Sequence, residues 1–185
     1  MSIKLKIVVF FIITILLGVL FFLTRKTALN TRQEPIPTKQ ATYRDLMPGK
    51  TLRSIVVDFL GKPTNETTVN NSVIQEYPSS DKERNLYVYV NSEEIVYLII
   101  EPVLPSEPFL KGIENFQSPD LVLYGPYSPL GFNLFVNLTR GMAVLANPNT
   151  QTIYERWYFP ITTKDYFLSA YSTGYSLIPP PTEQE

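Results

Sequence analysis

The hydrophobic pattern of the chain opens with an uncharged, mostly apolar run at residues 7–23, which lysines precede and Arg25 and Lys26 follow. As a helix this run would extend about 25 Å, close to the roughly 30 Å hydrocarbon core of a bilayer. A cleaved signal peptide is the alternative, but it requires small residues before the cleavage site, and Ala28 is the only one nearby. The pattern therefore predicts a membrane anchor at residues 1–26 that contacts the lipid bilayer through residues 7–23.

Two polar segments without a hydrophobic period flank the rest of the chain. Residues 27–44 contain two prolines among polar side chains, which is typical of a linker. Residues 177–185 form a Pro-rich tail that ends in acidic residues. The folded part is therefore expected between residues 45 and 176.

Residues 52–60 show helical periodicity. They follow Gly49-Lys50-Thr51, a tripeptide that also ends phosphate-binding loops. The apolar positions at i, i+3, i+4, i+7 and i+8 are Leu52, Ile55, Val56, Phe59 and Leu60. A phosphate loop is excluded because Arg44 stands where its first glycine should be, and no apolar strand leads into it. The segment is predicted to be an amphipathic helix that Thr51 caps and Gly61 ends.

Alternation of apolar and polar positions predicts strands after residue 73, and the pattern recurs in the second half of the chain. Residues 85–88 (NLYV) match residues 133–136 (NLFV) at an offset of 48. The second half adds a further strand at residues 152–159. We therefore predict an α+β fold, in which an N-terminal transmembrane helix precedes a tandem repeat of a helix plus an antiparallel three- to four-stranded meander.

The repeat divides the folded part into two predicted units. Residues 45–104 form the first α-β-β-β unit, and residues 105–176 form the second, α-β-β-β-β unit. The second unit is expected to open with a helix within residues 106–116. A closing helix is expected to start near Thr162 or Thr163.

The composition narrows the possible chemistry, because the chain contains no Cys and no His. Cysteine and serine–histidine nucleophiles, zinc sites and histidine acid–base catalysis are therefore excluded. We identify no catalytic residues, no metal ligands and no cofactor site.

Charge is distributed unevenly along the chain. Four of the 16 basic residues and none of the 17 acidic residues precede residue 27, so residues 27–185 carry 12 basic and 17 acidic residues. An acidic region without a basic patch argues against a nucleic-acid partner. Because a short head before an early anchor usually stays inside, we expect a single-pass membrane protein whose C-terminal part is extracytoplasmic.

Residues 47–63, MPGKTLRSIVVDFLGKP, resemble the signature of the BamE-like (SmpA/OmlA) outer-membrane-assembly lipoproteins. In that family a turn with Gly and Thr, here Gly49 and Thr51, opens a helix that ends in Leu-Gly-x-Pro, here residues 60–63, and a meander follows. The tandem arrangement is similar to that of the β-lactamase-inhibitory proteins. The lipid-bearing Cys of the lipoproteins is absent. The resemblance implies a binding or assembly protein of the bacterial cell envelope rather than an enzyme.

An aromatic cluster at residues 121–132 (LVLYGPYSPLGF) is the candidate partner-binding site. Tyr124, Tyr127 and Phe132 lie among Gly and Pro residues, so the loop can hold their rings rigidly, as in protein- or sugar-binding surfaces. The alternative is that these rings cover a sheet edge and fill the core. Trp157 is expected to pack in the core.

These observations predict a membrane-anchored, extracytoplasmic binding or assembly module without catalytic activity. Its partner would be an envelope protein or a glycan. A carboxylate-dependent envelope hydrolase is the first alternative, and a cleft with two carboxylates about 5 to 10 Å apart would favour it. The second alternative is a structural spacer within a membrane assembly.

Overall fold

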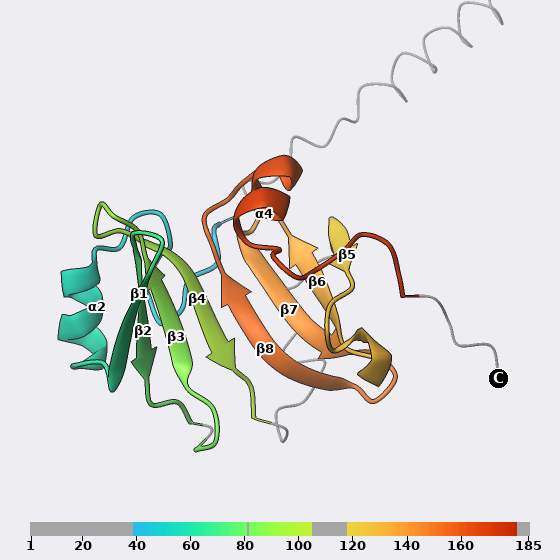
Figure 1. The fold of residues 1–185 in the computed structure, drawn as a ribbon, viewed down its shortest axis with the longest axis horizontal. Helices are drawn as coiled ribbons and strands as arrows, with labels where there is room; N and C mark the ends of the chain where they lie inside the picture. The colour runs from blue at the N-terminus through green and yellow to red at the C-terminus, as the bar shows by residue number, and fades with distance from the viewer. Residues whose placement is uncertain (1–38, 81, 105–117, 181–185) are drawn as a thin grey trace, which may run out of the picture. The chain divides into compact units, whose positions relative to one another are not determined.

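The computed structural model describes residues 39–80, 82–104 and 118–180, which are coloured in Figure 1. The chain divides into two compact units, Met1–Pro37 and Thr38–Glu185, and all described residues belong to the second unit. The predicted anchor at residues 1–26 and the predicted helix within residues 106–116 lie outside the described residues.

The described part of the chain forms an antiparallel sheet of eight strands (Figure 1). The strands are β1 (Asn65–Val69), β2 (Ser72–Tyr77), β3 (Leu86–Val90), β4 (Val96–Pro102), β5 (Leu121–Leu123), β6 (Asn133–Asn137), β7 (Met142–Asn147) and β8 (Thr152–Tyr158). Their order across the sheet is β1-β2-β3-β4-β8-β7-β6-β5. Two four-stranded meanders therefore lie side by side, and the pairing of β4 with β8 joins them.

The two faces of the sheet can be assigned from the pairing of β4 with β8. Ile99 lies opposite Tyr158, and Ile100 lies opposite Trp157. Because side chains alternate along a strand and cross-strand partners share a face, Ile99 and Tyr158 mark one face and Ile100 and Trp157 the other. We call these the α2 face and the α4 face, after the helix that packs on each.

Helix α2 (Arg53–Leu60) packs on the α2 face of the first meander. Its Val56 side chain is fully buried in a cluster with Val88 and Ile99. The ring of Tyr43, which precedes the helix, packs 5.9 Å from the ring of Tyr158 in the same cluster. This side of the core therefore depends on residues from both meanders.

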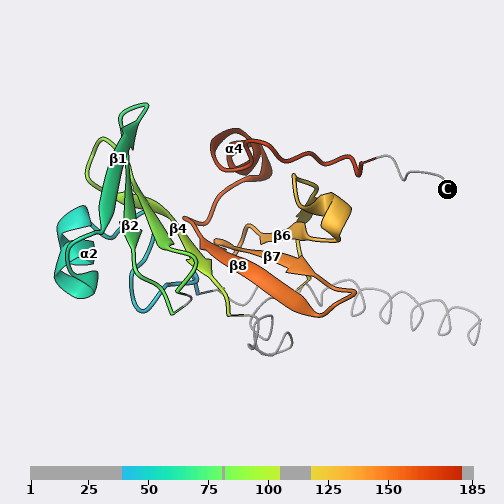
Figure 2. The same ribbon diagram turned by 60° about the horizontal axis from the view of Figure 1, so that its bottom comes forward.

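Helix α4 (Lys164–Ala170) lies over the second meander on the other face of the sheet, as Figure 2 shows. The ring centroids of Phe159 and Phe167 are 4.8 Å apart, and Trp157 and Leu145 belong to the same buried cluster. The Thr163 side chain caps the helix by accepting a hydrogen bond from the backbone of Tyr166. The predicted closing helix and the core position of Trp157 are confirmed.

The prediction for helix α2 is correct in position but wrong in detail. Leu52 is the N-cap residue, whereas the Thr51 hydroxyl accepts a hydrogen bond from the backbone N–H of Met47 at 2.8 Å. Only Val56 of the predicted apolar stripe is buried, whereas Ile55 and Phe59 remain 50% and 54% exposed. The helix is only eight residues long and covers a narrow part of the sheet, which explains why three of the five stripe residues face outward.

The predicted fold class is wrong. Instead of a tandem repeat of a helix plus a meander, the described residues form an eight-stranded antiparallel sheet with two short α-helices. The predicted first unit has three strands, whereas the structure has four, because β1 precedes β2 and pairs with it along its whole length. Its alternation was missed because every side chain in β1 is exposed, so no apolar period marks it.

The prediction of a single-pass transmembrane protein must also be corrected. Within residues 39–80, 82–104 and 118–180, neither helix is long and apolar enough to cross a membrane. The apolar run at residues 7–23, on which the prediction rested, lies outside the described residues.

We predict that Gly141→Ala destabilises the fold. Gly141 follows β6 with φ +65°, and a Cβ atom there would overlap the carbonyl oxygen of Phe159. Gly174→Ala is the matched control, because Gly174 has φ +86° but nothing within 4 Å of its Cβ position. The free energy of unfolding should fall by about 1–3 kcal/mol more in Gly141→Ala than in the control. Equal losses in urea unfolding would show that the overlap does not matter.

Candidate functional site

The predicted aromatic site separates into two parts in the structure. Tyr124 forms a bridge with Ser176, since each backbone N–H donates to the other's carbonyl at 2.8 Å. Tyr127 and Phe132 instead converge on Tyr154 of β8, with ring centroids 5.6 and 5.9 Å from it. Two of the three predicted residues, Tyr127 and Phe132, therefore pack against Tyr154, which was not predicted as a site residue.

The loop that carries Tyr127 and Phe132 is held by local hydrogen bonds. The Ser128 hydroxyl, at the start of the 3₁₀ turn η1 (Ser128–Leu130), accepts a hydrogen bond from the backbone N–H of Gly125 and donates one to Asn133 Oδ1, each at 2.9 Å. The ring of Tyr175 lies directly against Gly125, where a Cβ atom would not fit. Tyr127 is nevertheless 41% exposed, so the loop presents its ring to solvent.

Arg84, just before β3, connects this aromatic group to the seam between the meanders. Its guanidinium lies 4.2 Å from the centroid of the Tyr154 ring. The Nη1 group donates to the carbonyl of Tyr154 at 2.8 Å, and the Nη2 group donates to the carbonyl of Val103 at 2.6 Å. The side chain thus bridges the end of β4 to β8 while stacking on a tyrosine.

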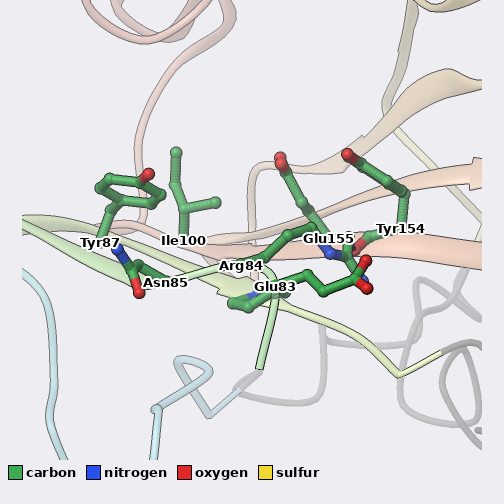
Figure 3. Close-up of a pocket in the computed structure, with 8 residues that line it drawn as sticks. Glu83, Arg84, Asn85, Tyr87, Ile100, Tyr154 and Glu155 are labelled. Atoms are coloured by element: carbon green, nitrogen blue, oxygen red, sulfur yellow. Dashed lines mark hydrogen bonds between the residues drawn. The ribbon is translucent and has the colours of Figure 1, made fainter. Parts of the chain in front are cut away.

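A pocket of about 220 Å³ opens beside Arg84 on the α4 face (Figure 3). Its lining consists of Glu83, Arg84, Asn85, Tyr87, Ile100, Pro102, Tyr154 and Glu155. These residues come from the segment just before β3, from β3 itself and from the paired strands β4 and β8, so the pocket lies where the two meanders meet.

Tyr154 and Glu155 both line the pocket although they are adjacent in a strand. Leu145 of β7 lies opposite Glu155, but the next residue, Ala146, lies opposite Ile153, so Tyr154 has no partner in β7. This irregularity has the form of a β-bulge, which redirects side chains locally. Consecutive side chains therefore reach the same face.

Glu155 is the chemically distinctive residue of the pocket. Its Oε2 atom accepts a hydrogen bond from the indole Nε1 of Trp157 at 2.9 Å. Burial raises the pKa of the Glu155 carboxyl, while the Trp157 hydrogen bond and the charge of Arg84 partly oppose this effect. No ion pair involves Glu155 in the described part of the chain. The site therefore holds a carboxyl group that is costly to ionise.

Tyrosines surround this carboxyl group from several elements. Burial is the main cause that raises the pKa of Tyr89 in β3 and that of Tyr175 after α4, the latter to about 12, and the negative charge of Glu155 adds to both shifts. The Tyr175 ring also packs edge-on against Trp157, with ring centroids 5.8 Å apart. These hydroxyl groups remain protonated at neutral pH, so they can donate hydrogen bonds but cannot act as bases there.

The described residues contain no group of three or more His, Asp or Glu side chains that could hold a metal ion. The sequence analysis missed Arg84, Tyr154 and Glu155. Glu155 lies two residues before Trp157, which was assigned to the core, so a charged residue on that face was an available signal. The position of Arg84 depends on the pairing of β4 with β8, which are far apart in the chain, so no local sequence pattern indicates it.

We predict that Glu155→Gln stabilises the protein at neutral pH. A carboxyl group whose pKa is raised by folding binds its proton more tightly in the folded state than in the unfolded state. The protonated carboxyl therefore adds to the free energy of unfolding at pH values below the unfolded pKa. That contribution is lost as the pH rises from the unfolded pKa through the folded pKa. Glutamine removes that loss and can still accept the Trp157 hydrogen bond. Urea midpoints should be higher than wild type at pH 7 and similar to it at pH 3, whereas the exposed control Glu93→Gln should change little at either pH.

Comparisons of the chain with protein-family models, with curated proteins and with solved structures found no match. The resemblance of residues 47–63 to the BamE-like lipoproteins therefore stays a prediction.

Proposed function

We propose that this chain is a non-catalytic binding module that recognises a protein or glycan on the α4 face of its sheet. The main observation in support is that the aromatic loop directly contacts the wall of the pocket between β4 and β8, which we call the seam pocket. Exposed Tyr127 packs against Tyr154, and Tyr154 stacks on Arg84 at the pocket wall. Tyrosine and arginine are the residue types that most often dominate binding energy at interfaces.

The rigidity of this surface supports a binding role. The loop is fixed by the Ser128 hydrogen bonds and by Tyr175 against Gly125, so Tyr127 would lose little freedom when a ligand covers it. The ring also presents an apolar body and a hydroxyl group together. The resemblance of residues 47–63 to the BamE-like assembly lipoproteins, which are binding proteins, agrees with this proposal.

A carboxylate-dependent hydrolase is the second candidate, and the raised pKa of Glu155 is the observation that favours it. Such an enzyme needs a second carboxylate directed at the same bond. Glu83 is the other carboxylate of the pocket, but Figure 3 shows the two side chains extending in different directions. The binding role therefore accounts for more of the site.

We predict that Tyr127→Ala weakens capture of the partner. The full chain would be used to isolate a partner from an extract of the source organism, and its affinity would then be measured with purified components. Loss of an exposed aromatic anchor should weaken binding roughly tenfold or more.

Tyr166→Ala is the matched control, because Tyr166 is an exposed tyrosine of α4 that does not line the pocket. It should leave the affinity unchanged. Equal affinity of wild type and Tyr127→Ala would contradict the proposed surface. Hydrolysis of a glycan or peptide by wild type that Glu155→Gln abolishes would favour the second candidate.

A further inference from the structure

Several carboxylates of the sheet form ion pairs, but Glu155 forms none among the described residues. Arg53 pairs with Glu66 at 2.6 Å and with Glu94 at 3.3 Å, and Arg156 lies 3.6 Å from Glu101. Among the described residues, no Lys or Arg forms such a pair with Glu155. A desolvated carboxylate lowers its free energy by binding a cation, and the charge of Arg84 offsets only part of the cost of burying Glu155.

Arg84 does not form an ion pair with Glu155, because its two Nη groups donate to backbone carbonyls. They donate to the carbonyls of Tyr154 and Val103, and the guanidinium plane rests over the Tyr154 ring. Glu83 and Glu155 are the two carboxylates among the lining residues, and Arg84 is the one basic residue among them.

The remaining walls suit the stem of a long basic side chain. Ile100 offers an aliphatic surface on the side of Glu155, and Tyr87 offers an aromatic ring beyond Ile100, as Figure 3 shows. Basic side chains bury their methylene groups against such surfaces while the charged end reaches a carboxylate or an aromatic face. The volume of about 220 Å³ is below the roughly 300–1,000 Å³ of most small-molecule sites, so it fits one side chain better than a cofactor.

We propose that the seam pocket receives a lysine or arginine side chain from a protein partner, and that Glu155 binds its charged end. This inference rests on the proposed binding function and names the chemistry of the ligand. The excess of acidic over basic residues after residue 27 favours the same kind of partner by attracting basic surfaces.

Trp157 provides a direct reporter, because it is the single Trp of the chain and its indole N–H donates to Glu155. The full chain, labelled with ¹⁵N, would be titrated with Nα-acetyl-lysine methylamide and Nα-acetyl-arginine methylamide while the indole N–H signal is followed by NMR. Nα-acetyl-norleucine methylamide is the uncharged control ligand. At least one basic probe should shift the signal in a saturable manner, and the norleucine probe should not.

Glu155→Gln should weaken binding of the basic probe roughly tenfold or more, whereas Glu93→Gln should not. The indole signal itself shows whether the variant is folded. The wild-type affinity should also fall as the pH is lowered through the raised pKa of Glu155. Among the residues that the structure describes, the other charged or titratable groups near Glu155 are Glu83, Arg84, Tyr87, Tyr89, Tyr154 and Tyr175.

An unchanged indole signal, equal shifts with norleucine, or undiminished binding to Glu155→Gln would each overturn the inference. Its failure can be separated from failure of the proposed function. If Tyr127→Ala no longer binds the partner but Glu155→Gln binds it as wild type does, the proposed binding function is supported and the proposed basic ligand is wrong. If the lysine probe binds normally but Tyr127→Ala keeps full affinity for the partner, the pocket chemistry stands and the proposed surface is wrong.

Discussion

The pairing of β4 with β8 determines most of what is distinctive in this structure. It joins two meanders that are otherwise separate, and it defines which residues share the α2 face and which share the α4 face. The same pairing places Glu155 opposite Pro102 and brings the carbonyls of Val103 and Tyr154 within reach of Arg84. The pocket is therefore a product of the seam, because neither meander contains it alone.

Two irregularities in the strands concentrate aromatic side chains on the α4 face. One leaves Tyr154 without a partner in β7, and the other leaves Tyr97 of β4 without a partner in β3. Tyr97 then packs 6.0 Å from Tyr89 and 6.2 Å from Tyr171, measured between ring centroids. Bulges of this kind interrupt the regular alternation, so one face receives more large rings than a regular sheet would give it.

Sequence patterns predicted elements whose signals are local. The strand at residues 152–159 and a closing helix that starts near Thr162 or Thr163 were predicted because alternation and capping involve neighbouring residues. The single sheet could not be derived in this way, because the register of β4 with β8 joins residues far apart in the chain. The same reason explains the candidate site. Tyr127 and Phe132 were recognisable from their Gly- and Pro-rich loop, whereas Glu155 became a candidate only once its burial was known.

The place of β8 in the sheet has a consequence for how the protein is made. β4 is complete at Pro102, but the strand that pairs with its outer edge begins at Thr152. During synthesis, β4 therefore has an unpaired edge while the ribosome adds about fifty residues, which takes a few seconds at typical rates. An open edge is a template for pairing with other chains. The nascent first meander thus passes through an interval in which prompt arrival of its own C-terminal strand competes with association between molecules.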